Sequence, residues 1–190
     1  MLKEISEQIR KCKNCDLHTT RTHAVPGEGN PESGIVFIGE APGRWEDMKG
    51  LPFVGRSGKL LDKMLAEVGL DRTKVYITNI VKCRPPENRR PKKDETETCS
   101  LYIHKQLEIM APKVIIPLGN TAGEWLFKKY DLKWPGATKA NGQLYELSTL
   151  FGKLIILPAF HPAAIHACEP IPPRVGVRAE KRLLRGAGGV

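Results

Sequence analysis

Four of the five cysteines are the residues whose types and spacing point most directly to chemistry. Cys12 and Cys15 form a Cys-x-x-Cys pair, a spacing that lets both thiolates face one metal centre. Cys83 and Cys99 form a much wider pair, whereas a zinc ribbon usually has a second Cys-x-x-Cys. The spacing therefore favours an iron–sulfur cluster slightly over zinc, and leaves open a redox or structural role for each thiol. Cys168 has no partner pattern, and we expect a free thiol there.

Basic residues are concentrated in two segments. The chain has a net charge of +9 and a pI of about 9.4. Residues 82–93 hold six basic residues and one acidic residue, and residues 174–190 hold five and one. Clusters of this kind are typical of surfaces that bind a phosphate backbone, although a generally basic surface is the alternative. The charge distribution favours a nucleic acid as the partner.

The length and hydropathy of the chain limit the class of protein. Its 190 residues fit one domain, or one domain with a tail, and 41% of them are hydrophobic, enough for a core. The apolar runs are too short to cross a bilayer, and residues 1–7 have no apolar signal region. We therefore expect a cytoplasmic monomer without a membrane partner. Its thiols would be reduced there, and clustered cysteines would be ligands or catalysts rather than disulfides.

Strand and helix patterns alternate along the chain. Apolar runs predict strands, and 3.6-residue periodicity with capping residues predicts helices. The pattern indicates an α/β fold: a three-layer sandwich with a central, mostly parallel four-stranded sheet. We expect one domain over residues 1–168 and a basic tail over residues 169–190. The expected strands are 35–38, 75–78, 114–118, and 142–147 with 154–157; the expected helices are 2–11, 57–70 capped by Ser57, 94–110 with a capping box of Asp94 and Glu97, and 121–130.

Polar or glycine-rich turns follow each of the predicted strands. They are Gly39–Gly43, Asn79, Gly119–Asn120 and His161–Pro162. Ligands of open α/β sheets bind outside the carboxyl ends of the strands. We therefore expect these four turns to converge on one edge, which is the candidate active site.

Five motifs in the same order resemble the family 4 uracil-DNA glycosylases. They are Gly39–Gly43, Glu46–Asp47, Pro52–Gly55, Thr78–Arg89 and His161–Ala163. The resemblance covers most of the chain, from Cys12 to Ala164. It implies a monofunctional DNA-repair hydrolase that flips uracil out of single- or double-stranded DNA and leaves an abasic site. It also implies that the four cysteines bind a 4Fe-4S cluster, with zinc as the weaker alternative.

The resemblance assigns roles to three residues around the base. Phe53 would be the aromatic platform for the flipped base. The amide of Asn79 would accept from uracil N3–H and donate to O4, a pattern that cytosine cannot match. His161 would donate to uracil O2 and stabilise the negative charge of the departing base.

The resemblance does not assign the residue that activates water. Ala41 stands where the classical enzymes have a water-activating Asp, so it can line the substrate site but cannot act as a base. Glu40 is the catalytic candidate that positions the substrate or the water. The base is Glu40 or Asp47, or no base is needed because the bond is largely broken before water attacks.

The loop after Cys83 is the candidate DNA-binding segment. Arg84, Asn88 and Arg89 would contact the DNA backbone, although a solvated basic loop is the alternative. Asn141 stands where relatives often have a basic residue, so one phosphate contact is in doubt. Beyond Ala164 the chain departs from the family pattern.

Two other functions compete with the glycosylase. The first is a noncatalytic nucleic-acid-binding module with a metal-stabilised fold, and Asn79 and His161 argue against it. The second is a small redox protein. Such carriers usually have denser cysteine runs than this chain contains.

Overall fold

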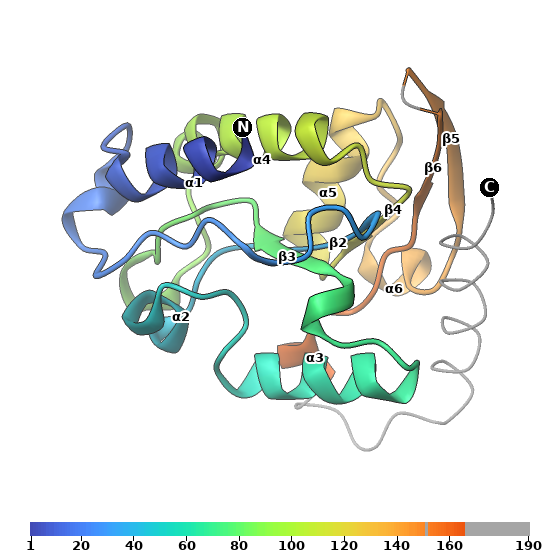
Figure 1. Ribbon diagram of the computed structural model, residues 1–190, viewed down its shortest axis with the longest axis horizontal. Helices are drawn as coiled ribbons and strands as arrows, with labels where there is room; N and C mark the ends of the chain where they lie inside the picture. Colours follow the sequence, from blue (N-terminus) through green and yellow to red (C-terminus); the bar gives the residue numbers. More distant parts are fainter. Residues whose placement is uncertain (151, 166–190) are drawn as a thin grey trace.

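A single six-stranded sheet forms the centre of the computed structural model, which describes residues 1–150 and 152–165. The strand order is β1-β3-β2-β4-β6-β5, and helices lie on both faces (Figure 1). The strands are β1 (Glu28–Gly29), β2 (Ile35–Gly39), β3 (Tyr76–Asn79), β4 (Val114–Pro117), β5 (Tyr145–Thr149) and β6 (Gly152–Ile156).

The four inner strands, β3, β2, β4 and β6, run parallel to one another. This confirms the predicted α/β class and the mostly parallel sheet. The predicted number of four strands is wrong, because β1 and β5 pair antiparallel with the two outer parallel strands. β1 has two residues, too few to give an alternation pattern in the sequence.

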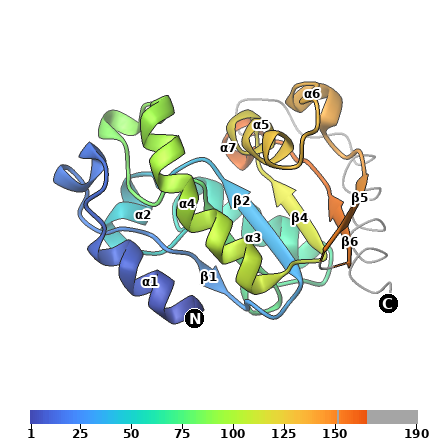
Figure 2. The same ribbon diagram turned by 90° about the horizontal axis from the view of Figure 1, so that it is seen from above.

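Helices cover both faces of the sheet, as a three-layer sandwich requires. α1, α4 and α5 lie over one face, and α3 lies over the other, with α7 packed against it (Figures 1 and 2). The helices are α1 (Leu2–Lys11), α2 (Arg44–Lys49), α3 (Arg56–Glu67), α4 (Lys93–Met110), α5 (Asn120–Lys129), α6 (Ala137–Ala140) and α7 (Pro162–Ile165).

Alternating side chains of the inner strands feed two hydrophobic clusters. On β2, Val36 and Ile38 join the cluster under α1, α4 and α5, while Ile35 and Phe37 join the one that contains Leu61 and Leu65 of α3. Successive residues of a strand point to opposite faces, so a strand buried on both faces reads as a continuous apolar run. The two clusters hold the carboxyl ends of β2, β3 and β4 in a fixed arrangement.

Two predicted helices start one residue earlier than expected, and their predicted caps are wrong. α3 begins at Arg56 after Gly55, so Ser57 is inside the helix and does not cap it. α4 begins at Lys93, and the capping box uses Glu95, whose Oε2 accepts from the backbone N–H of Lys92 at 2.7 Å. At α4 the sequence contains several acidic residues able to form the capping box, and the bonds of Glu95 to Arg89 select the one that is used.

None of the helices within residues 1–150 and 152–165 is long and apolar enough to span a membrane. The predicted basic tail and Cys168 lie outside the described residues.

Candidate active site and cysteine centre

Gly39, the last residue of β2, is where the predicted base-binding residues meet. A Cβ atom placed on Gly39 would lie 2.3 Å from Asn79 Oδ1 and 2.7 Å from Phe53 Cζ. Asn79 pairs directly with Gly39 across the parallel strands β3 and β2, which brings the amide to this point. The side chains of Asn79 and Phe53 are therefore neighbours, and the hydrogen of a glycine is all that fits between them.

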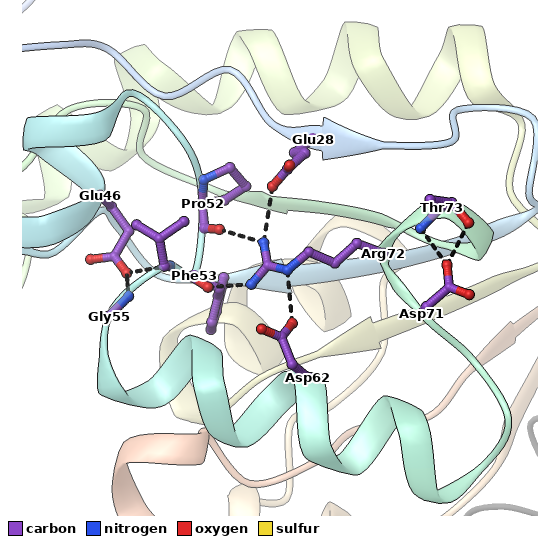
Figure 3. A network of polar contacts seen from close by, with 10 residues as sticks. Glu28, Glu46, Pro52, Phe53, Gly55, Asp62, Asp71, Arg72 and Thr73 are labelled. Carbon is purple, nitrogen blue, oxygen red and sulfur yellow. Dashed lines mark hydrogen bonds and ion pairs between the residues drawn. The ribbon is translucent and has the colours of Figure 1, made fainter.

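Phe53 is buried, with 5% of its surface exposed, and its backbone is left-handed with φ of 50°. This conformation costs a residue with a side chain roughly 1–2 kcal/mol, so its surroundings must hold it. The loop is held at both ends: the Arg72 guanidinium donates to the carbonyls of Pro52 and Phe53, and Glu46 Oε1 accepts from the N–H groups of Val54 and Gly55, each at 2.8 Å (Figure 3).

His161 lies beside Phe53, with the two ring centroids 5.7 Å apart. Its Nδ1 accepts from the backbone N–H of Ala163 at 3.1 Å, which leaves the proton of a neutral imidazole on Nε2. Burial lowers the pKa of His161 below its usual 6.5, against the opposing effect of the Glu40 and Glu46 carboxylates. The imidazole is therefore neutral at pH 7 and has one N–H free to donate.

The turn that carries His161 is fixed by two neighbours. Gly119 has φ of 85°, and its missing side chain makes room for His161 Cβ, which would lie 3.0 Å from a Cβ on Gly119. Asn141 Oδ1 accepts from the N–H of Phe160 at 3.0 Å. Asn141, the departure from the family pattern, therefore supports the backbone next to His161.

The three residues considered for water activation lie in different environments. Glu40 is half-buried and accepts a hydrogen bond from the Thr121 hydroxyl on α5. Asp47 is 3% exposed, and its Oδ1 accepts from the N–H groups of Thr22 at 2.9 Å and His23 at 3.3 Å. Ala41 packs against the core. Asp47 is thus engaged in holding residues 22 and 23, whereas Glu40 is close enough to His161 to interact with its ring electrostatically.

The four predicted ligand cysteines line one cavity. Cys12 and Cys15 come from the end of α1 and the turn after it, Cys83 from the loop after β3, and Cys99 from α4. Within the part of the chain that is described, no three Cys, His, Asp or Glu side chains are grouped to hold a single metal ion. The thiols are instead distributed around the cavity wall.

Hydrogen-bond donors approach two of these sulfurs. Arg21 Nη1 donates to Cys83 Sγ at 2.9 Å, and the backbone N–H of Lys82 donates to Cys99 Sγ at 3.2 Å. Burial raises the pKa of Cys83, and it raises the pKa of Cys99 to about 12. Buried thiols with N–H donors are suited to a metal centre, which replaces their protons.

Lys82 connects the cysteine cavity to the end of β3 that carries Asn79. Its side chain is 1% exposed, and Nζ donates to Thr78 Oγ1 at 2.7 Å, the Asn79 carbonyl at 2.6 Å and Gln106 Oε1 at 2.7 Å. Burial lowers the pKa of Lys82 to about 7. The ammonium ties the end of β3, which carries Asn79, to α4, which carries Cys99.

The predicted DNA-binding residues in the loop after Cys83 have different partners. Arg84 Nε donates to Asn88 Oδ1 at 2.7 Å, and Asn88 has a left-handed φ of 57°. Arg89 is engaged elsewhere: its two Nη atoms bond the carboxylate of Glu95 at 2.8 and 2.6 Å. Glu95 is 3% exposed, and the Arg89 guanidinium lowers its pKa. The loop is ordered by its own side chains.

Comparison with known proteins identifies the family. The model of the uracil DNA glycosylase superfamily matches residues 26–170. A type-4 uracil-DNA glycosylase of Archaeoglobus fulgidus is 48% identical over 164 residues, which are 86% of this chain and 82% of that protein. Type-4 uracil-DNA glycosylases of Saccharolobus solfataricus and Thermotoga maritima are 46% and 45% identical, over 88% and 86% of this chain and 78% and 82% of theirs.

The chain belongs to the uracil-DNA glycosylase superfamily. The predicted resemblance to the type-4 enzymes is confirmed by these relatives. In this family member the structure brings together Asn79, Phe53 and His161 at one edge of the sheet, and the four cysteines at one cavity.

Sequence reasoning missed several residues that position the site. Arg21, Arg72 and Thr121 bond residues 62, 19 and 81 positions away in the chain. Only an arginine placed close after the Cys-x-x-Cys pair gave any signal, and the sequence does not show which sulfur Arg21 would reach.

Proposed function

We propose that this protein removes uracil from DNA by hydrolysing the N-glycosidic bond, which leaves an abasic site for base excision repair. The observation that carries the proposal is the meeting of Asn79, Phe53 and Gly39 at the carboxyl edge of the sheet, with His161 beside them. Membership of the superfamily supports the same reaction. The substrate is uracil-containing DNA, single- or double-stranded.

Base recognition follows from the pocket. The flipped uracil stacks on Phe53, a ring whose position is fixed by its loop. The Asn79 amide accepts from N3–H and donates to O4, while cytosine presents the opposite polarity at these positions. A buried site that must satisfy its own amide rejects cytosine strongly, because the mismatch would leave a polar group unpaired.

The leaving group is stabilised by a neutral histidine. Cleavage puts negative charge on the departing base and positive charge on the sugar. The Nε2–H of His161 donates to uracil O2, where charge develops, and the Ala163 N–H holds the required tautomer. A neutral donor gains more from the anionic transition state than from the neutral substrate, which raises the rate of the chemical step.

Glu40 is the residue that we assign to the water. Its carboxylate is oriented by the Thr121 hydroxyl and interacts electrostatically with the His161 ring. Asp47 is already bonded to two backbone N–H groups, so it is poorly placed to accept a proton from water. Ala41 lines the substrate site and has no group that could act as a base.

The cysteine cavity fits an iron–sulfur centre. Cys12, Cys15, Cys83 and Cys99 would hold a 4Fe-4S cluster, with one thiolate at each iron corner. Thiols distributed around a cavity suit such a cube better than one tetrahedral zinc ion, which needs all sulfurs about 2.3 Å from a single point. The cluster would supply structural cross-linking. We place the protein in the cytoplasm, because that compartment keeps thiols reduced and available to the centre. We expect it to be a monomer.

DNA contacts come from the loop after Cys83. Arg84 and Asn88 form one bonded pair that presents a guanidinium to a phosphate. Arg89 supports the same loop, because its two Nη atoms bond the Glu95 carboxylate and Nη1 also donates to the Arg90 carbonyl at 3.0 Å.

An excision assay tests the reaction. The purified protein is incubated with a single-stranded oligonucleotide that contains one uracil, and abasic sites are then cleaved with alkali. We expect a cleaved product from wild type, none from an oligonucleotide with cytosine at that position, and a loss of 100-fold or more in Asn79→Ala. An absence of product under conditions where another uracil-DNA glycosylase works would contradict the proposal.

The cofactor has a separate test that does not depend on activity. We expect a brown protein with a broad visible absorption near 400 nm, about four iron atoms per chain and no zinc by elemental analysis. Cys99→Ser should lose the absorption, while a serine at Cys168, which we do not assign to the centre, should retain it. Stoichiometric zinc in protein isolated without oxygen would overturn the cluster assignment.

A further inference from the structure

Arg72 lies at the centre of a polar network beside the loop Pro52–Gly55 (Figure 3). Its guanidinium reaches four acceptors from three segments of the chain. Nη1 donates to the Pro52 carbonyl and to Glu28 Oε2, each at 2.9 Å, and Nε donates to Asp62 Oδ1 at 2.7 Å. Nη2 donates to the Phe53 carbonyl. The side chain is 22% exposed, so most of it is shielded from water.

Two carboxylates orient the guanidinium. Glu28 comes from the edge strand β1 and Asp62 from α3, so the arginine is held from two sides of the loop. The remaining N–H groups then point at the two backbone carbonyls. A planar fork with five donors can satisfy two carboxylates and two carbonyls together, whereas the ammonium of a lysine has three donors around one atom.

The carbonyl that Arg72 binds belongs to the residue with the left-handed backbone. Phe53 has φ of 50°, which a phenylalanine adopts only where its surroundings impose it. On the other side of this carbonyl is Gly58 of α3, where an added Cβ would overlap the Phe53 oxygen at 1.6 Å. The Phe53 peptide is thus enclosed between Arg72 and Gly58.

We propose that Arg72 is a positioning residue for uracil recognition, which holds the backbone of Phe53 so that its ring is a rigid platform under the flipped base. The inference rests on the proposed function of the pocket. Arg72 acts through Phe53 and touches no substrate. Its donors fix the carbonyls of residues 52 and 53, while Glu46 fixes the N–H groups of residues 54 and 55, so the three successive peptide groups between residues 52 and 55 are held.

Kinetics of a double-mutant cycle test the coupling. Arg72→Met, Arg72→Lys, Phe53→Ala and the double variant Arg72→Met/Phe53→Ala are compared by single-turnover excision of uracil from a single-stranded oligonucleotide. We expect Arg72→Met to slow excision 30-fold or more and to weaken inhibition by free uracil about tenfold, with Arg72→Lys in between. In the Phe53→Ala background, Arg72→Met should cost less than threefold.

Lys74→Met is the matched control, because Lys74 lies in the same short helix (Arg72–Lys74), is exposed, and bonds the Gly69 carbonyl. It should leave the excision rate and uracil inhibition unchanged. Binding of a uracil-free oligonucleotide should stay within twofold in all variants. Should Arg72→Met fail to fold, Arg72→Lys replaces it in the cycle.

Amide hydrogen exchange tests the inference without using catalysis. Exchange in the peptide that covers residues 52–55 should be tenfold faster or more in Arg72→Met, with no change in Lys74→Met. A folded Arg72→Met with wild-type exchange and wild-type excision would overturn the inference, as would an equal loss in the presence and absence of Phe53. If wild type excises no uracil, the proposed function fails, and exchange alone still decides whether Arg72 holds the loop.

Discussion

At the scale of single residues, the proposed base site depends on the absence of a side chain at Gly39. Gly39 is in the extended part of β2 and has no positive φ, so alanine is compatible with its backbone. Its added Cβ would nevertheless lie 2.3 Å from Asn79 Oδ1 and 2.7 Å from Phe53 Cζ. We expect Gly39→Ala to displace both side chains and to reduce kcat/KM for uracil excision about 100-fold or more.

The melting temperature and the visible spectrum of Gly39→Ala separate this effect from misfolding. Both should stay close to wild type, because the two displaced side chains border the pocket. A Gly39→Ala variant that keeps wild-type kcat/KM would show that the base does not approach this point.

His161 gives a pH dependence whose sign follows from the lowered pKa of its half-buried ring. Its pKa is below the usual 6.5 in the folded protein, so the unfolded chain binds more protons as the pH falls past 6.5. The free energy of unfolding should therefore decrease as the pH drops below 6.5. The His161→Gln variant, which has no titrating ring, should lose less stability over that interval.

Parallel chemical denaturation of both proteins between pH 7.5 and pH 5.5 measures this difference. The free energy of unfolding of wild type minus that of His161→Gln should decrease as the pH falls. A constant difference would mean that the His161 ring has the same pKa in the folded and unfolded protein.

At the scale of secondary-structure elements, one buried lysine connects the two sites. Lys82 bonds Thr78, the Asn79 carbonyl and Gln106, and no polar side-chain atom buried within the described residues lacks a partner. Lys82→Met would leave three acceptors without this donor. We expect a loss of about 3 kcal/mol in the free energy of unfolding, because each unsatisfied buried group costs about 1–3 kcal/mol and some rearrangement is possible.

Thermal unfolding of the protein as isolated measures this loss, and ~3 kcal/mol should lower the Tm by roughly 6–12 °C. Lys63→Met on the exposed surface of α3 is the matched control and should change stability by less than about 0.5 kcal/mol. Equal melting temperatures for the two variants would contradict a supporting role for Lys82.

The elements also show what the sequence could predict. The inner parallel strands were predictable because burial on both faces leaves continuous apolar runs such as Ile35–Ile38. β1 was not, because its two residues become a strand only by pairing with Tyr76 and Ile77. Asn79 and His161 were recognisable as residues that follow strands. Arg72 was not, because a basic residue in a turn reads as solvated until the fold brings Pro52 and Phe53 to it.

At the scale of the whole molecule, the net charge of +9 predicts binding to DNA that weakens with salt. The structure divides this charge between residues that are free to meet phosphates and residues that hold the fold. Within the described residues, the one hydrogen bond of the Arg84 side chain goes to the neutral amide of Asn88. Arg89 instead neutralises Glu95, which is buried at the start of α4.

The two arginines should therefore respond differently to substitution. Each phosphate contact with single-stranded DNA contributes about −0.7 to the slope of log K against log salt. Arg84→Ala should make that slope shallower by about 0.7 and leave the Tm unchanged. Arg89→Ala should lower the Tm by several degrees, because it leaves the Glu95 carboxylate buried without its partner cation.

Titrations of a fluorescent uracil-free oligonucleotide between 50 and 200 mM salt, with melting curves of the same samples, measure both quantities. Lys3→Ala, at the exposed start of α1, serves as the control for removal of one positive charge. If Arg89→Ala and Arg84→Ala change the slope equally and neither changes the Tm, both guanidiniums meet phosphates and the Glu95 pair contributes nothing to the fold. A lower Tm in Arg89→Ala alone would instead assign Arg89 to the order of the loop and Arg84 to the DNA.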